Sequence, residues 1–162
     1  MENYLMLNGK RIDLTEEQVK ILGFEEKKDC FTRNVDGAYF YITAQGNVTN
    51  DFESYGCVTS GCRYNVGNYC TDESLMKQRA LHEILDRLLW RFSMQNDGDK
   101  IDWNDGSYKY YIYHTNEPDA FLIDRATACK RFLIYFHTRE IAQRAIKEIV
   151  FPFMDKHPEF VW

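Results

Sequence analysis

The clearest hydrophobic pattern in the chain is a stripe with helical spacing in its middle. Apolar residues recur there at intervals of three and four, and this 3.6-residue period predicts an amphipathic helix over about 72–95. The sequence Asn96-Asp97-Gly98 is expected to end it. The stripe consists of Leu81, Ile84, Leu85, Leu88, Leu89 and Phe92.

A second stripe near the C-terminus predicts another helix. Thr138 is suited to cap it, and Pro152 is expected to end it. The tail from 151 to Trp162 is hydrophobic enough to dock on the rest of the protein. The apolar face of this helix comprises Ile141, Ala142, Ala145, Ile146, Ile149 and Val150.

Runs of aromatic and β-branched residues on the N-terminal side of each helix predict strands. Between Ser54 and Asn68 the glycines and small polar residues instead predict irregular strands and loops. In the first half we expect a strand at Ala38–Ile42 and a return strand that begins at Val48 and weakens by Asp51. In the second half we expect a strand at Tyr108–Tyr113, a turn at Asn116–Asp119 and a return strand at Phe121–Ile123. The second half is also expected to contain a third strand, at Arg131–Phe136.

The N-terminal segment predicts a small module of its own. Asn8-Gly9 favours a tight hairpin turn. Thr15 and Gln18 have the spacing of a capping box at the start of a short helix, and Gly23 is placed to end that helix.

The rest of the chain consists of two halves whose sequences resemble each other. Phe40-Tyr41-Ile42 matches Tyr110-Tyr111-Ile112, and the alignment places Cys70 with Phe136. Chance similarity between two amphipathic helices is the rival explanation. The predicted fold is one α+β domain spanning 1–162. Its parts are a hairpin-helix module at 1–23, two halves that each contain a small antiparallel sheet followed by a helix (37–95 and 107–150), and a docked tail at 151–162.

Composition narrows the classes of function. A hydrophobic fraction of 44% is ample for a packed core. The net charge of −5 disfavours a dedicated nucleic-acid binder, which needs a basic footprint. The opening residues do not resemble a signal peptide, and no apolar run has the length of a membrane span. We therefore expect a cytoplasmic protein with no membrane role.

Cysteine spacing and motifs point away from metal and catalytic chemistry. Five cysteines without secretory context predict free thiols. Cys57, Cys62 and Cys70 lack the close pairs of a structural zinc site. The remaining cysteines and the histidines are scattered, and no nucleophile or phosphate-loop motif occurs. We predict no enzyme, no catalytic residue, no cofactor and no metal.

One surface stands out as a candidate binding site. The acidic loop, residues 97–106, gathers four aspartates and an indole between the two halves. It is either a solvated connection or a partner-binding surface, in which an aromatic anchor ringed by polar groups suits a hot spot. Its candidate residues are Asp97, Asp99, Asp102, Trp103 and Asp105. A basic face is the alternative surface, formed by Arg87, Arg91, Arg125, Lys130, Arg131, Arg139 and Arg144.

Several short motifs occur along the chain, at Leu7–Lys10, Leu14–Lys20, Gly23, Arg63–Cys70, Tyr111–Tyr113, Tyr135–Thr138 and Ala142–Ile146. Together they resemble small, largely uncharacterised proteins of phages and prophages of Gram-positive bacteria. Some small, acidic phage proteins of this general kind are anti-CRISPR proteins, which bind a Cas effector. The resemblance spans most of the chain and implies no catalytic residue.

The resemblance implies a phage-encoded inhibitor that binds a host Cas effector nuclease, first of all Cas9, alone or with its guide RNA, in the bacterial cytoplasm. Inhibition by occupying a nucleic-acid groove and by locking an inactive state both stay open. Two alternatives remain. One is a phage structural or accessory protein that self-associates, for instance as a homodimer, and the other is a small nucleic-acid-binding regulator.

Overall fold

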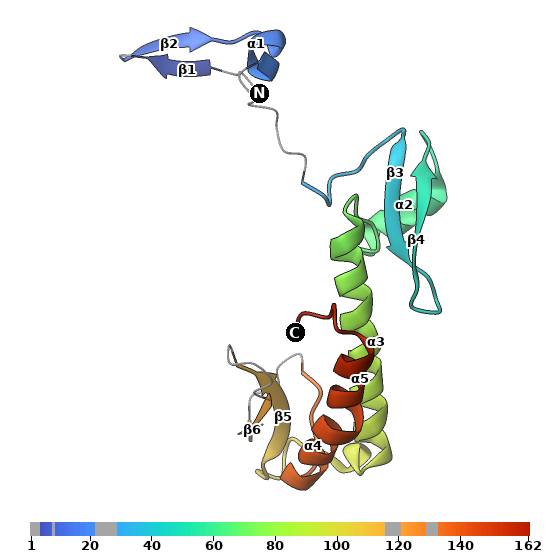
Figure 1. Cartoon of the computed structure of the whole chain (residues 1–162). Coiled ribbons are helices and arrows are strands. Elements are labelled where there is room, and N and C mark those ends of the chain that lie inside the picture. Colours follow the sequence, from blue (N-terminus) through green and yellow to red (C-terminus); the bar gives the residue numbers. More distant parts are fainter. Residues whose placement is uncertain (1–3, 8, 22–28, 116–120, 129–132) are drawn as a thin grey trace. The chain divides into compact units, whose positions relative to one another are not determined.

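Short antiparallel hairpins alternate with helices along the chain, and the fold class is α+β, as predicted (Figure 1). The structure is a computed structural model, and it describes residues 4–7, 9–21, 29–115, 121–128 and 133–162. The predicted turn at Asn116–Asp119 and the cap at Gly23 lie outside these residues. The contacts between residues divide the chain into two compact units, Met1–Thr32 and Arg33–Trp162, which are described separately.

The first unit contains the predicted hairpin and helix. Strands β1 (Tyr4–Leu7) and β2 (Lys10–Asp13) pair so that Leu7 lies opposite Lys10, and Gly9 has a φ of 76°. The capping box is confirmed at the start of α1 (Glu16–Ile21). The Thr15 amide donates to Gln18 Oε1 at 2.9 Å, and the Gln18 amide donates to Thr15 Oγ1 at 3.3 Å.

The first half of the second unit begins with strands β3 (Gly37–Ile42) and β4 (Val48–Glu53). The return strand therefore runs past Asp51, where the sequence predicted that it weakens. A third segment pairs with β3 through a bridge between Phe40 and Cys70. The Asn68 side chain extends this pairing, because it exchanges hydrogen bonds of 2.7 and 2.8 Å with the Ile42 backbone.

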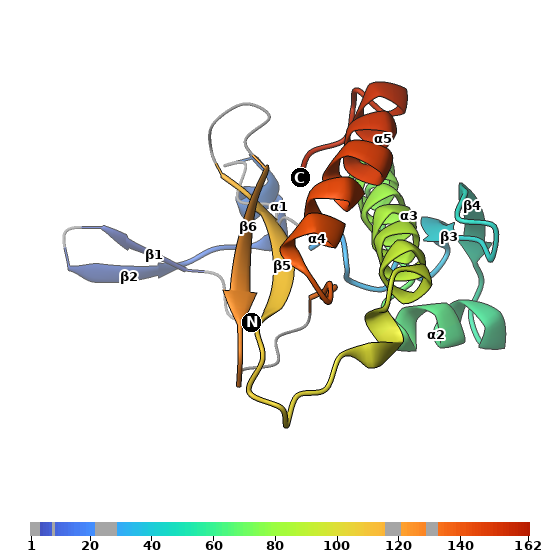
Figure 2. The same ribbon diagram turned by 90° about the horizontal axis from the view of Figure 1, so that it is seen from below.

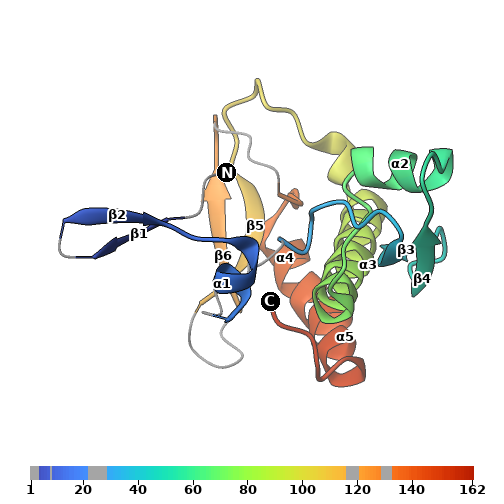
Figure 3. The ribbon, with the colours of Figure 1, turned by 90° about the horizontal axis from the view of Figure 1, so that it is seen from above.

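The prediction of irregular structure at 54–68 is wrong, because helix α2 (Val58–Asn65) forms there. Gly61 and two β-branched residues depress its intrinsic helix propensity. Tertiary contacts compensate for this low helix propensity. Ser60 is fully buried, and Arg63 donates to the Tyr39 hydroxyl at 2.6 Å and to Asp51 at 2.7 Å. Figure 3 shows α2 beside the β3–β4 hairpin.

Helix α3 (Glu73–Gln95) confirms the central stripe. Asp72 caps it by accepting from the Leu75 amide at 3.0 Å, and Asp97, with a φ of 68°, follows its end. Strands β3 and β4 contact this helix and lie beside its N-terminal part (Figure 1). Farther along, Leu81, Leu85, Leu89 and Phe92 belong to the main core, together with residues of β5, α4 and the tail. One helix therefore serves both halves.

The second half repeats the scheme with β5 (Lys109–His114) and β6 (Phe121–Ala126). The prediction of a third strand at Arg131–Phe136 is wrong for the residues of this segment that the structure describes. Residues 129–132 lie outside the description, and in 133–136 only Phe136 pairs, through a bridge to Tyr110. Ser93 on α3 donates to the Tyr135 carbonyl, so a helix side chain contacts the backbone of this segment.

The C-terminal helix does not end at Pro152, which corrects that prediction. It passes from α4 (Arg139–Ala145) through the π-helical segment η2 (Ile146–Val150) into α5 (Phe151–Lys156). Within an α-helix a proline loses one hydrogen bond and clashes with the carbonyl four residues earlier. The π-turn, in which the Phe151 amide bonds to the Ile146 carbonyl, places Pro152 in the first turn of α5, where its missing N–H is tolerated.

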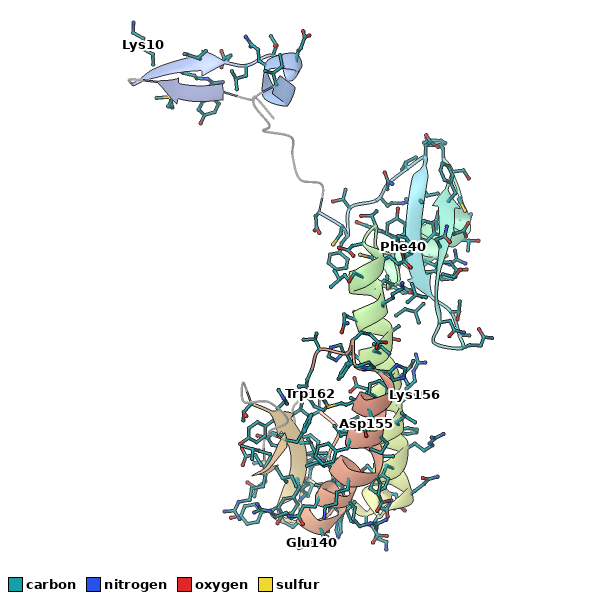
Figure 4. All side chains as sticks on the ribbon, in the orientation of Figure 1. Lys10, Phe40, Glu140, Asp155, Lys156 and Trp162 are labelled. Carbon is teal, nitrogen blue, oxygen red and sulfur yellow. The ribbon has the colours of Figure 1, made fainter. Side chains whose placement is uncertain are left out.

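The tail docks on the second unit. Phe160 is buried, and the Gln78 side chain bonds to the Glu159 carbonyl at 2.7 Å and to the Val161 amide at 3.0 Å. Trp162 lies at the end of this tail (Figure 4), and its ring is 4.9 Å from that of Phe121. Figure 2 shows α4 and α5 beside α3, with β5 and β6 on the other side of α4.

The two halves share one arrangement, as the internal similarity predicts. Each has a hairpin whose first strand is bridged by a later segment, Phe40 with Cys70 and Tyr110 with Phe136. The next helix begins three residues after each bridge. No helix within the described ranges combines the length and apolar character needed to cross a membrane.

Candidate functional site

The acidic loop has a defined conformation. It opens with the 3₁₀ turn η1 (Gly98–Lys100), where Asp97 forms an ion pair with Lys100 at 2.7 Å. Asp102 accepts from the Asn104 amide at 2.9 Å, and Asp105 accepts from the Ser107 amide at 2.8 Å. Aspartates that bond to the backbone two residues ahead stabilise turns. The loop is therefore built from three consecutive locally bonded turns.

A buried lysine fastens this loop to the second sheet. Lys109, the first residue of β5, is 1% exposed, and its ammonium donates to Asp105 and to the carbonyl and hydroxyl of Ser107, both at 2.9 Å. Trp103 packs edge-on against Tyr135 at 4.8 Å, with the Lys109 ammonium 5.7 Å from the indole. Trp103 is thus half-buried and engaged inside the chain. The sequence identified the indole but not Lys109, which looks like an ordinary strand residue.

The four aspartates of the loop differ in their electrostatic surroundings. The hydrogen bond from Lys109 lowers the pKa of Asp105 to about 2. The hydrogen bond from Lys100 lowers the pKa of Asp97. Asp99 and Asp102 are exposed and form no ion pair with any residue that the structure describes. Two exposed carboxylates without an ion pair therefore lie between two ion-paired ones, and Asp99 still interacts with the charge of Lys100.

The described members of the predicted basic face have different surroundings. Arg144 pairs with Glu148 at 2.9 Å, and Arg87 pairs at 3.0 Å with Glu83, which it shares with Arg79. Lys130 and Arg131 lie outside the described residues. Arg125 and Arg139, in contrast, line the same hollow beside β6.

The described cysteines differ in burial and in their contacts. In the described part of the chain, no three His, Cys, Asp or Glu side chains lie close enough to hold a metal ion. Cys70 is buried in its bridge to β3, whereas Cys62 is exposed on α2. The Ser60 amide and hydroxyl lower the pKa of the Cys57 thiol at the start of that helix. Cys129 lies outside the described residues.

Sequence reasoning missed a buried polar network in the first half. The Glu53 carboxylate is 0% exposed and accepts from Arg33 Nε at 2.6 Å, from the Tyr69 hydroxyl at 2.7 Å and from Ser60 at 3.4 Å. The Tyr69 hydroxyl also accepts from the Asn34 amide at 2.8 Å. The network ties residues 33–34, β4, α2 and the bridge segment together. An acidic residue at the end of a strand gave no signal of this burial.

A tyrosine–aspartate pair recurs in both sheets. Tyr39 lies opposite Asp51 and donates to it at 3.4 Å, and Tyr111 lies opposite Asp124 and donates to it at 2.9 Å. In each case the other aspartate oxygen accepts from the next backbone amide at 2.8 Å. In the first half Arg63 completes the group by stacking over Tyr41 at 3.5 Å. The pair belongs to the common architecture of the halves.

The outer side of α2 is an exposed apolar surface. Val58 is 78% exposed, and Val66, just after the helix, is 76% exposed. Cys62 lies between them at helical spacing, and Tyr55 before the helix is 91% exposed. Apolar side chains exposed to this degree on neighbouring turns mark a candidate protein-binding surface.

Known proteins offer no guide to these surfaces, since no family model, no curated protein and no solved structure matches the chain.

Proposed function

We propose that the protein is a phage-encoded inhibitor that binds a host defence nuclease, first of all Cas9, and covers its basic nucleic-acid groove with the acidic loop. The observation that carries this proposal is the pair of exposed carboxylates at Asp99 and Asp102, which form no ion pair among the described residues. They lie on a loop fastened by Lys109 and Trp103. A groove that holds nucleic acid presents the opposite charge, and complementary charges accelerate association.

Rigidity of the loop supports the same function. A flexible acidic segment loses conformational entropy when it binds, whereas a loop already held in turns loses less. Asp97 and Asp105 contribute to this rigidity through their own ion pairs, so their role is to hold the loop. Asp99 and Asp102 are the residues assigned to the partner.

The test begins with capture of partners from host lysate by the tagged protein, followed by a DNA-cleavage assay with the captured nuclease. The variant Asp99→Asn/Asp102→Asn removes two charges without disturbing Lys109. The matched control, Glu140→Gln/Asp155→Asn, removes two exposed carboxylates elsewhere that also form no ion pair among the described residues. We expect the loop variant to inhibit at least about tenfold more weakly, equivalent to about 1.4 kcal/mol, and its binding to lose most of its salt dependence.

The control variant should inhibit like the wild type. Full inhibition by a folded Asp99→Asn/Asp102→Asn protein would exclude the groove mechanism. If no nuclease is captured and none is inhibited, the inhibitor proposal itself is wrong.

The outer side of α2 favours a second candidate, a self-associating phage accessory protein. Val58, Cys62 and Val66 form a neutral apolar stripe, on which two copies would meet without like charges. Sedimentation of the wild type and of Val58→Asp distinguishes this candidate. A dimer that the substitution dissociates would support it, and a wild-type monomer at high concentration would exclude it.

A further inference from the structure

The two halves of the second unit contain equivalent hollows of opposite charge. In the first half a hollow of about 590 Å³ lies between Phe40 of β3 and the start of α3. In the second half a hollow of about 300 Å³ lies between Tyr110 of β5, strand β6 and the start of α4. Phe40 and Tyr110 are the bridge residues of their strands, so the hollows occupy corresponding places.

Their linings differ at the residue that begins the helix. Glu73 follows the Cys70 bridge by three residues and Arg139 follows the Phe136 bridge by three. The first hollow is lined by Thr71, Asp72, Glu73, Ser74 and Lys77 beside Phe40. The second is lined by Ile123, Asp124, Arg125 and Arg139 beside Tyr110. The same architectural space is acidic in one half and rich in guanidinium groups in the other.

The two arginines of the second hollow keep their charges available. Neither Arg125 nor Arg139 forms an ion pair with a carboxylate of the described residues, whereas Arg79, Arg87 and Arg144 each pair with a glutamate. The Arg125 guanidinium stacks over the Tyr108 ring at 4.0 Å, which restricts its position. Two like charges at one hollow favour a ligand of opposite charge.

Asp124 also lines this hollow, but its carboxylate is engaged elsewhere. Oδ2 accepts from the Tyr111 hydroxyl and Oδ1 from the Arg125 amide. Tyr111 lies opposite Asp124 and Tyr110 lies opposite Arg125. Because side chains alternate along a strand, the first pair lies on one face of the sheet and the second pair on the other. The arginine face therefore carries the positive charge.

We propose that the hollow between Arg125 and Arg139 binds a phosphate group. Guanidinium groups bind phosphate oxygens through paired, charge-assisted hydrogen bonds. A phosphate monoester carries a charge of about −1.5 to −2 at neutral pH, which matches two arginines better than a single carboxylate does. Tyr110 lines the same space, and a tyrosine hydroxyl is a neutral hydrogen-bond donor. Free phosphate and the phosphate of a nucleotide share this chemistry.

The experiment is a titration of the whole protein with inorganic phosphate, followed by NMR of the arginine Nε–Hε groups at constant ionic strength, with sodium chloride as the reference. Saturable shifts confined to Arg125 and Arg139 are expected. Arg139→Gln should weaken phosphate binding by at least about tenfold, the effect of losing a hydrogen bond between charged groups. Lys77→Gln removes one positive charge at the equivalent hollow and should leave the affinity unchanged.

A parallel titration with adenosine monophosphate separates the two sources of phosphate. Equal affinity would assign the hollow to the phosphate group alone, and at least tenfold tighter binding would assign it to a nucleotide. Shifts that grow linearly and equally with chloride and phosphate would overturn the proposal. So would an Arg139→Gln protein that melts like the wild type and keeps full affinity.

Discussion

Replacing Glu53 by glutamine removes one charge from the buried network of the first half while keeping the side chain's shape. The wild-type carboxylate has no exposure to water and accepts from Arg33, Tyr69 and Ser60. Glutamine has one acceptor oxygen and one amide donor in place of two acceptors. If its oxygen accepts from Arg33, its amide faces the Tyr69 hydroxyl, which already accepts from the Asn34 amide. The tyrosine then loses the acceptor for its own proton.

The expected loss of stability follows from the two groups that lose their partner, the Arg33 guanidinium and the Tyr69 hydroxyl. Removing one partner of a buried ion pair costs about 3–5 kcal/mol. The Arg33 side chain is 39% exposed, so water offsets part of its lost pairing and the lower end of this range applies. We expect the free energy of unfolding to fall by about 3 kcal/mol, a large part of the ~5–15 kcal/mol of a typical domain.

Urea denaturation followed by circular dichroism measures this change, and Asp51→Asn on the same strand is the matched control. Asp51 pairs with Arg63, but its side chain is 49% exposed, so its replacement should cost much less. Equal losses in the two variants, or a Glu53→Gln protein as stable as the wild type, would refute the assigned burial.

The same network predicts a dependence on pH. Burial raises the pKa of Glu53, but hydrogen bonds from Tyr69 and Arg33 outweigh it and hold the pKa below its ordinary value. A depressed pKa contributes stability that is present above the unfolded value, about 4.3, and is lost as the pH falls through the folded value. The difference in stability between wild type and Glu53→Gln should therefore shrink below about pH 4.

Three further changes test the remaining architecture. Leu85→Asp should unfold the protein, because an unpaired charge in the core costs several kcal/mol, whereas Trp90→Asp on the exposed side of the same helix should melt near the wild-type temperature. Thr138→Ala should lower the free energy of unfolding by about 1 kcal/mol through loss of the cap to the Ile141 amide, and Thr138→Ser should restore most of it. Thiol titration in denaturant should find every cysteine reduced, and metal analysis should find no zinc; one zinc per chain would contradict that prediction.

Elements whose stability is local were predictable from the sequence. The stripe of α3, the Thr15–Gln18 box and the Thr138 cap each depend on residues a few positions apart. The helix α2 was missed because its stability comes from Arg63 and Ser60, whose partners lie elsewhere in the fold. Local propensity does not report such partners.

The last helix shows why a proline alone does not predict where a helix ends. Pro152 breaks an α-helix only where its missing N–H and its ring meet a regular preceding turn. The π-turn changes that geometry, and nothing about Ile146–Val150 in the sequence marks it.

The acidic loop was predictable in composition but not in its internal bonding. From the sequence alone, the four aspartates and the indole are equally good candidates for contacting a partner. Lys100 pairs locally with Asp97. Lys109 of β5 binds Asp105 and Tyr135 contacts Trp103, which leaves Asp99 and Asp102 as the exposed aspartates without an ion pair among the described residues. These contacts depend on β5 and on residue 135 coming together, so they arise from the tertiary fold.

Because α3 serves both halves, the order in which the chain is synthesised matters. A ribosome that has released residues up to Gln95 has exposed Leu81, Leu85 and Leu89, while Phe136 and the C-terminal helix that cover them are still to be made. Exposed apolar surface on a nascent chain promotes aggregation and recruits chaperones. The apolar face of α3 therefore stays uncovered until the C-terminal helix has been synthesised.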